Sequence, residues 1–278
     1  MSWAYRILNV FALEGERLSG NPLAVFEDAR GLTDAQMQAL ALQMNLSETT
    51  FVLPSDRADA QVRIFTPSYE MPFAGHPTLG TASVVAGDGA RVVLEMKAGL
   101  VPVTREGDRF TLQTTGERRT RPVEASRAEL ASMLGLEADA VGDEPRWVST
   151  GVEQLVIPIR TPALVAAARP VPALLERWGF SETRSEAMAY LVAEGQPRWT
   201  VRFFFTSNGA VLEDPATGSA CANLGGWLFE RGRAPLRVSL QQGEAVRRPS
   251  HLELQVDAAG HIFVSGAVIE LGRGTIEL

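Results

Sequence analysis

Cysteine and histidine are scarce in this chain of 278 residues, which holds one cysteine, Cys221, and three histidines. A single cysteine cannot form a disulfide within the chain, which fits a reducing compartment and predicts a cytoplasmic protein. The histidines His76, His251 and His261 have no cysteine or carboxylate at ligand spacing, so we expect no metal site.

Long apolar runs and basic clusters are also missing. No stretch approaches membrane-spanning length, and the first residues lack the charged-then-apolar plan of a signal peptide. The net charge is -7 and no basic run exceeds Arg118-Arg119, so we expect neither a membrane nor a nucleic-acid partner. The glycine-rich nucleotide-binding motifs are absent, and Ser219 lies outside a Gly-x-Ser-x-Gly elbow.

Two stretches rich in small residues stand out, at 73–82 (Phe-Ala-Gly-His-Pro-Thr-Leu-Gly-Thr-Ala) and 213–222 (Glu-Asp-Pro-Ala-Thr-Gly-Ser-Ala-Cys-Ala). Each places a polar residue before proline, as His76-Pro77 and as Asp214-Pro215. Proline suits the first position of a helix, and aspartate is a favoured N-cap. Both stretches therefore predict the N-terminus of a helix.

The similarity extends upstream of both stretches. Val-Arg-Ile-Phe at 62–65 precedes the first, and Val-Arg-Phe-Phe at 201–204 precedes the second. This order of motifs favours a duplicated domain in which each half presents one helix N-terminus. The alternative is a chance match of short motifs.

The rest of the chain predicts strands with a few helices. Helices are expected at 77–86 and 215–230, the first buried because it has almost no charged face. Thr33 with Gln36 and Ser126 with Glu129 form possible capping boxes. The polar segment 115–121 is the expected domain boundary. Apolar runs predict strands at 5–11, 23–26, 49–53, 61–66, 91–95, 101–105, 109–115, 154–159, 187–192, 200–205, 236–240, 252–256 and 262–268.

Three side chains could carry acid–base chemistry. A helix N-terminus should keep His76 neutral and able to exchange a proton, or His76 is simply a buried histidine satisfied by backbone. Asp214 is either a catalytic group or a structural N-cap. Glu48 lies between a predicted helix and a strand, where burial would favour acid–base work; exposed, it would be an ordinary loop carboxylate.

The remaining candidates would bind rather than react. Gly75, Gly218 and Ser219 could offer backbone N–H groups to an anionic substrate such as a carboxylate. Cys221 lies inside an apolar helix and is interpreted as a packing residue rather than a nucleophile.

The motifs that carry these residues resemble the PhzF-like family, to which the phenazine-biosynthesis isomerase belongs. The resemblance spans the chain and rests on the segments 20–22, 44–53, 63–67, 72–80, 213–220, 242–243, 248–250 and 272–275. It implies an α+β, diaminopimelate-epimerase-like fold with two pseudo-symmetric domains, each of strands wrapped around a central helix. The expected domains are 1–118, joined by a last strand at 266–278, and 119–265, with the active site in a cleft between them.

The resemblance also implies a function. Glu48 would move a proton, His76 and Asp214 would flank the substrate, and Ser47, Gly75, Gly218 and Ser219 would hold it. The family isomerase acts on trans-2,3-dihydro-3-hydroxyanthranilate, a small carboxylate, without a metal or organic cofactor, and works as a homodimer. Amino-acid racemisation by two thiols is excluded, because the chain has one cysteine.

Three alternatives stay open: a different substrate, a non-catalytic binding module, and a pseudo-enzyme whose role lies in its dimer surface. The family often carries a proline before the second motif, which Phe205-Thr-Ser207 lacks, so another small metabolite could be the substrate. A non-catalytic module could also hold an anionic metabolite in the same cleft, although a pure binder needs no proton shuttle.

Overall fold

The computed structural model describes residues 1–114, 116–207 and 209–278. The chain divides into two compact units, one formed by Met1–Gln113 with Ser265–Leu278 and the other by Thr114–Val264. In the part of the chain that is described, no helix is long and apolar enough to cross a membrane.

The predicted boundary segment is partly a strand. Thr115 lies outside the described residues, but Arg119–Pro122 forms strand β9, which pairs antiparallel with β10 (Arg146–Ser149). A polar, basic sequence is compatible with a strand here because three of its four residues are exposed.

The first unit contains two helices and most of its strands lie in the first half of the chain. Its elements are β1 (Ser2–Ala12), β2 (Asn21–Phe26), α1 (Asp34–Met44), β3 (Thr49–Leu53), β4 (Ala60–Phe65), β5 (Glu70–Met71), α2 (Gly75–Val85), β6 (Arg91–Met96), β7 (Gly99–Glu106), β8 (Arg109–Gln113) and the greater part of β18 (Ile262–Glu277).

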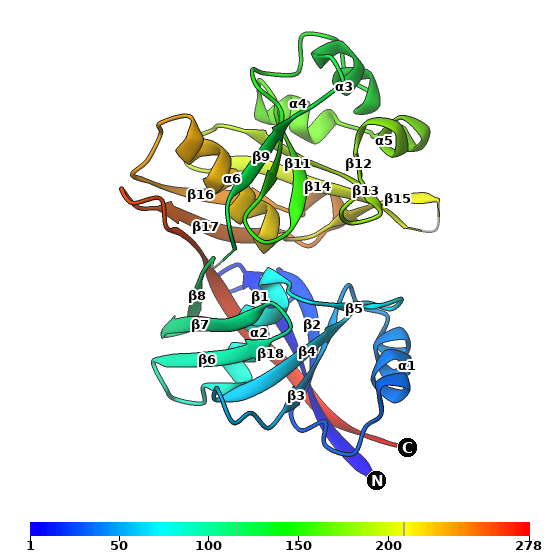
Figure 1. Ribbon diagram of the computed structural model, residues 1–278, viewed down its shortest axis with the longest axis vertical. Coiled ribbons are helices and arrows are strands. Elements are labelled where there is room, and N and C mark those ends of the chain that lie inside the picture. The colour runs from blue at the N-terminus through cyan, green and yellow to red at the C-terminus, as the bar shows by residue number, and fades with distance from the viewer. Residues whose placement is uncertain (115, 208) are drawn as a thin grey trace. The chain divides into compact units, whose positions relative to one another are not determined.

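Strand pairing in the first unit follows a defined order. β1 pairs antiparallel with β2 and β18, β2 parallel with β3, β3 antiparallel with β4, and β4 antiparallel with β5 but parallel with β6. Helix α2 lies among these strands (Figure 1) and has no charged residue, as expected of a helix that is buried along most of its length.

The second unit has four α-helices among its described residues. Besides β9 and β10, it consists of α3 (Arg127–Met133), β11 (Glu153–Pro158), α4 (Pro162–Ala167), α5 (Pro172–Trp178), β12 (Phe180–Ser181), β13 (Glu186–Ala193), β14 (Trp199–Ser207), β15 (Ala210–Asp214), α6 (Gly218–Glu230), β16 (Leu236–Gln242), the 3-10 turn Glu244–Val246 and β17 (Ser250–Val256).

The second unit repeats the pairing order of the first. β10 pairs antiparallel with β11, β11 parallel with β13, β13 antiparallel with β14, and β14 antiparallel with β15 but parallel with β16. Helix α6 packs against β10, β11 and β17. The segment β1-β2-β3-β4-β5-α2-β6 therefore has the same pairing as β10-β11-β13-β14-β15-α6-β16.

An arginine–glutamate pair occupies the same place in both repeats. Arg63 on β4 donates to both carboxylate oxygens of Glu70 on β5, at 2.8 and 2.7 Å. Arg202 on β14 donates to both oxygens of Glu213 on β15, at 3.0 and 2.7 Å. In each unit this bidentate pair fixes the short strand that leads into the buried helix.

The register of these strands shows which residues of the two helix starts correspond. This correspondence differs from the one that the sequence motifs suggested. Phe65 pairs with Glu70, and Phe204 pairs with Glu213. From the glutamates the chain takes the same number of steps to the first helical residues, Gly75 and Gly218. His76 therefore corresponds to Ser219, and not to Asp214 as the proline-containing motifs suggested.

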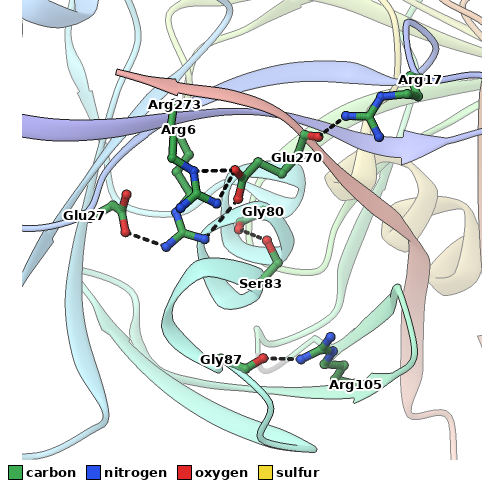
Figure 2. A network of polar contacts seen from close by, with 9 residues as sticks. All are labelled: Arg6, Arg17, Glu27, Gly80, Ser83, Gly87, Arg105, Glu270 and Arg273. Carbon is green, nitrogen blue, oxygen red and sulfur yellow. Dashed lines mark hydrogen bonds and ion pairs between the residues drawn. The ribbon is translucent and has the colours of Figure 1, made fainter. Parts of the chain in front are cut away.

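A polar network joins strands of the first unit beyond the C-terminal half of α2 (Figure 2). Arg6 on β1 lies 2.6 Å from a Glu27 oxygen and 3.0 Å from a Glu270 oxygen. Arg17 donates to the Glu270 main-chain carbonyl at 2.6 Å, and Arg273 donates to the Glu270 side-chain carboxylate. These bonds connect β1, β18 and the segment that follows β2.

Gly80 is required in α2 because a side chain there would meet the sheet. A Cβ atom at Gly80 would lie 2.4 Å from Leu23 Cδ2 and 3.0 Å from Val10 Cγ2. We expect Gly80→Ala to lower the free energy of unfolding by about 1–3 kcal/mol through overpacking, measured by urea denaturation. Gly272→Ala, where a Cβ would meet nothing within 4 Å, is the control and should change stability by less than about 0.5 kcal/mol. Equal stability of both variants would contradict the close packing of α2.

Candidate functional site

Glu48 lies in the segment between α1 and β3. Helix α1 ends at Asn45, which adopts the left-handed conformation with φ 51° and so turns the chain toward β3. Glu48 immediately precedes the first residue of β3, and its side chain is 15% exposed. The carboxylate is therefore largely withdrawn from water, which the sequence left open.

His76 lies beside Glu48. Its Nε2 atom lies 3.5 Å from Glu48 Oε2, and its side chain is 5% exposed. The helix begins at Gly75, two residues earlier than the first motif predicted, and the Thr78 N–H already donates to the Ala74 carbonyl at 3.2 Å. His76 is thus held inside the first turn of α2 rather than before it.

Asn21, at the start of β2, orients the His76 ring. Ser47 Oγ donates to Asn21 Oδ1 at 3.3 Å, and Asn21 Nδ2 lies 3.4 Å from His76 Nδ1. An amide nitrogen can only donate, so Nδ1 accepts and the proton of a neutral imidazole resides on Nε2. The ring then directs an N–H toward Glu48.

Asp214, in the second unit, is the last residue of β15 and does not cap α6 directly. Its Oδ2 atom accepts a hydrogen bond from Thr217 Oγ1 at 2.5 Å. Thr217 is the N-cap residue, but its side chain makes no capping bond. The helix begins at Gly218, three residues later than Pro215, where the sequence predicted its start.

Gln242, at the end of β16, explains this late start. Its Oε1 atom accepts from the Thr217 N–H at 3.2 Å, so a distant side chain replaces the local cap. Its Nε2 atom donates to the Asp214 carbonyl at 2.8 Å and to Thr217 Oγ1 at 3.0 Å. Since Thr217 Oγ1 accepts from the amide, its own proton points to the Asp214 carboxylate.

Gly218 and Ser219 open helix α6. Gly218 is buried, Ser219 is half-buried, and Ser219 Oγ accepts from Gln154 Nε2 at 2.9 Å. The first N–H groups of any helix lack partners within it, so these two residues and Gly75 lie where an anion can be bound. The structure thus groups Ser47, Glu48, Gly75 and His76 in the first unit, and Asp214, Gly218 and Ser219 in the second.

Cys221 is fully buried in α6. Burial raises the pKa of its thiol well above the ordinary value, so it stays protonated at neutral pH. A thiol rather than a thiolate is a poor nucleophile, which supports the packing role expected from sequence.

A cavity of about 220 Å³ lies elsewhere in the first unit and holds none of the predicted site residues. Its lining includes Arg6, Arg105 and Glu270. Arg6 and Glu270 are paired with each other, and Arg105 donates to the Gly87 carbonyl at the end of α2 (Figure 2). Its charged groups serve the architecture of the unit.

Comparisons with known proteins identify the family. A family model described as phenazine biosynthesis-like protein matches residues 8–270. An uncharacterized isomerase of Pasteurella multocida is 39% identical over 279 residues, which cover 99% of this chain and 94% of that protein. A trans-2,3-dihydro-3-hydroxyanthranilate isomerase of Pseudomonas chlororaphis is 34% identical over 291 residues, which cover 99% of each.

Solved structures extend the likeness to the fold. A PhzF-family phenazine biosynthesis protein from Bacillus anthracis matches with a TM-score of 0.85 at 22% identity over 100% of both chains. A hydroxyproline epimerase from Agrobacterium vitis matches with a TM-score of 0.65 at 13% identity, over 100% of this chain and 93% of that one. The sheet-rich fold is therefore epimerase-like, and the protein is an isomerase. It belongs to the PhzF family, as the sequence motifs indicated.

Gln242 should contribute measurably to stability because it satisfies the buried Thr217 N–H. It is fully buried, and Gln242→Met would leave that N–H and the Asp214 carbonyl without these bonds. We expect a loss of about 1–3 kcal/mol in the free energy of unfolding, measured by urea denaturation. Gln255→Met, at the exposed residue of the otherwise largely buried strand β17, is the matched control, and a similar loss in both variants would refute this role.

Proposed function

We propose that this chain is an isomerase that moves a proton between carbon atoms of a small carboxylate-bearing metabolite, with Glu48 as the acid–base group. The carrying observation is the nearly buried Glu48 carboxylate 3.5 Å from His76 Nε2. Glu48 would take a proton from one carbon, and the electron pair left behind would delocalise over the substrate. The resulting carboxylic acid would return the proton to a second carbon.

We take trans-2,3-dihydro-3-hydroxyanthranilate as the first substrate to test, because the Pseudomonas chlororaphis relative is named for it. Ser47, Gly75, Gly218 and Ser219 would hold its carboxylate and ring substituents. His76 and Asp214 would flank the substrate and orient it. The proposal uses no metal or organic cofactor, and it takes the active form to be a homodimer.

We further propose that the two units are pseudo-symmetric domains produced by duplication, each with strands around a central helix. The repeated strand pairing and the two bidentate arginine–glutamate pairs support this. Under this proposal Asp214 corresponds to Met71, so the second domain supplies an acid where the first has an apolar residue. The two halves would have kept the same strand and helix framework, while the side chains that contact the substrate would have diverged.

The test of Glu48 is proton NMR in D₂O with trans-2,3-dihydro-3-hydroxyanthranilate. Wild type should isomerise the ring and incorporate deuterium, whereas Glu48→Gln should lose roughly 10²–10⁴-fold in rate, the usual contribution of a positioned general base. Glu106→Gln, which changes an exposed carboxylate on β7, is the control and should retain full turnover.

Other outcomes separate the alternatives. Wild-type turnover by Glu48→Gln would remove Glu48 from the mechanism. Ligand binding without any deuterium exchange by wild type would favour a non-catalytic binder. If wild type shows no binding and no turnover, the search moves to other small carboxylates, which are screened by ligand-induced thermal stabilisation.

A further inference from the structure

A chain of buried polar side chains ends at Ser219. It consists of Thr150, Gln154 and Asn223, which are 7%, 1% and 0% exposed. Asn223 lies one turn beyond Ser219 in α6, and Gln154 lies on β11. None of these three residues was singled out by the sequence, and all three lie within the second unit.

The direction of every bond in this chain follows from one main-chain group. The Thr150 N–H can only donate, and it donates to Asn223 Oδ1 at 2.8 Å. Asn223 Nδ2 must then face the other way, and it donates to the Val152 carbonyl at 2.8 Å and to Gln154 Oε1 at 2.7 Å. Gln154 Nε2 is consequently turned toward Ser219 Oγ, 2.9 Å away.

These bond directions determine how the Ser219 hydroxyl can hydrogen-bond. Its oxygen accepts from Gln154, so its proton cannot also point at the Gln154 nitrogen. That proton is left to donate in another direction, and the side chain is half-buried with part of its surface accessible. Ser219 is thus set as a hydrogen-bond donor.

The first unit shows that the fold does not require this polar chain. Counted through the paired strands from the matched residues Phe65 and Phe204, Leu23 corresponds to Gln154. Their strand partners Leu8 and Val148 then correspond, and so do Val10 and Thr150 two residues later. By helix position Gly80 corresponds to Asn223. The same place in the first unit is therefore filled by Val10 and Leu23 against Gly80, with no hydrogen-bonding side chain.

We propose that Gln154 and Asn223 are positioning residues that hold Ser219 as a donor to a hydrogen-bond acceptor on the substrate, of the class of a carboxylate oxygen. This rests on the proposed function for the identity of the substrate, but the direction of the relay is a property of the protein alone. An acceptor is favoured at Ser219 because the hydroxyl keeps its proton for the substrate, whereas a reversed relay would use that proton on Gln154.

The relay is tested without substrate by NMR of the intact, isotope-labelled protein. We expect nuclear Overhauser contacts from the Gln154 side-chain NH₂ to the Ser219 Hβ atoms, and from the Asn223 NH₂ to the Val152 backbone. Contacts from the Gln154 NH₂ to the Asn223 side chain alone would mean that the relay runs in reverse, and would overturn the proposal. This result stands whether or not the proposed substrate is turned over.

Kinetics with trans-2,3-dihydro-3-hydroxyanthranilate tests the consequence by a double-mutant cycle. Ser219→Ala should lower kcat/KM roughly 10- to 100-fold, the range for a hydrogen bond to a charged group, with most of the loss in KM. In Gln154→Glu, the new carboxylate would accept the Ser219 proton. The loss in kcat/KM that this substitution causes should be at least about fivefold larger in wild type than in the Ser219→Ala background, where only the added charge acts. Equal losses in both backgrounds would refute the relay.

A variant that copies the first unit separates positioning from folding. Thr150→Val with Gln154→Leu and Asn223→Gly installs the residues found at the corresponding places, Val10, Leu23 and Gly80. We expect this protein to fold, with a cooperative thermal transition, but to lose about 10-fold in kcat/KM. A folded variant with unchanged kcat/KM would show that Ser219 needs no relay. If wild type turns over no substrate, the NMR contacts decide the relay and the proposed substrate fails separately.

Discussion

A backbone N–H can only donate a hydrogen bond, and in the second unit this constraint determines the polar geometry around the start of α6. The Thr217 N–H is received by the Gln242 amide, and the Thr150 N–H by the Asn223 amide. Each amide must then present its nitrogen on its other side, which sets the hydrogens that reach Asp214 and Ser219. Buried amides that are fully satisfied in this way have one arrangement, because reversing any of them would oppose two donors or two acceptors.

The two units share a framework of strands and a buried helix, and they differ in the side chains that this framework presents. Each framework comprises a bidentate arginine–glutamate pair, a short strand and a buried helix that begins with glycine. On this framework His76 stands in one unit where Ser219 stands in the other. The partner strand likewise presents apolar Leu23 or polar Gln154. Differences of this kind need few substitutions, since the main chain already places the side chain.

The sequence predicted what local signals determine. The capping boxes at Thr33 and Ser126 are confirmed, and so is the burial of the helix that contains His76. The start of α6 was predicted wrongly, because the partner of the Thr217 N–H is a glutamine 25 positions away. Asn223 and Gln154 are 69 positions apart, so no periodicity or spacing relates them. The one available signal was an asparagine among the small and apolar residues that follow Ser219 in α6.

Cysteine content constrains which chemistry this epimerase-like fold can perform here. A racemisation with two thiols as acid and base needs two cysteines, and the chain has one. That cysteine, Cys221, is buried with a raised thiol pKa, and Thr78 occupies the corresponding position of α2. Proton transfer by this chain must therefore rely on oxygen or nitrogen groups. In the proposed mechanism Glu48 supplies the oxygen group, and Asn21 turns the N–H of His76 toward the Glu48 carboxylate.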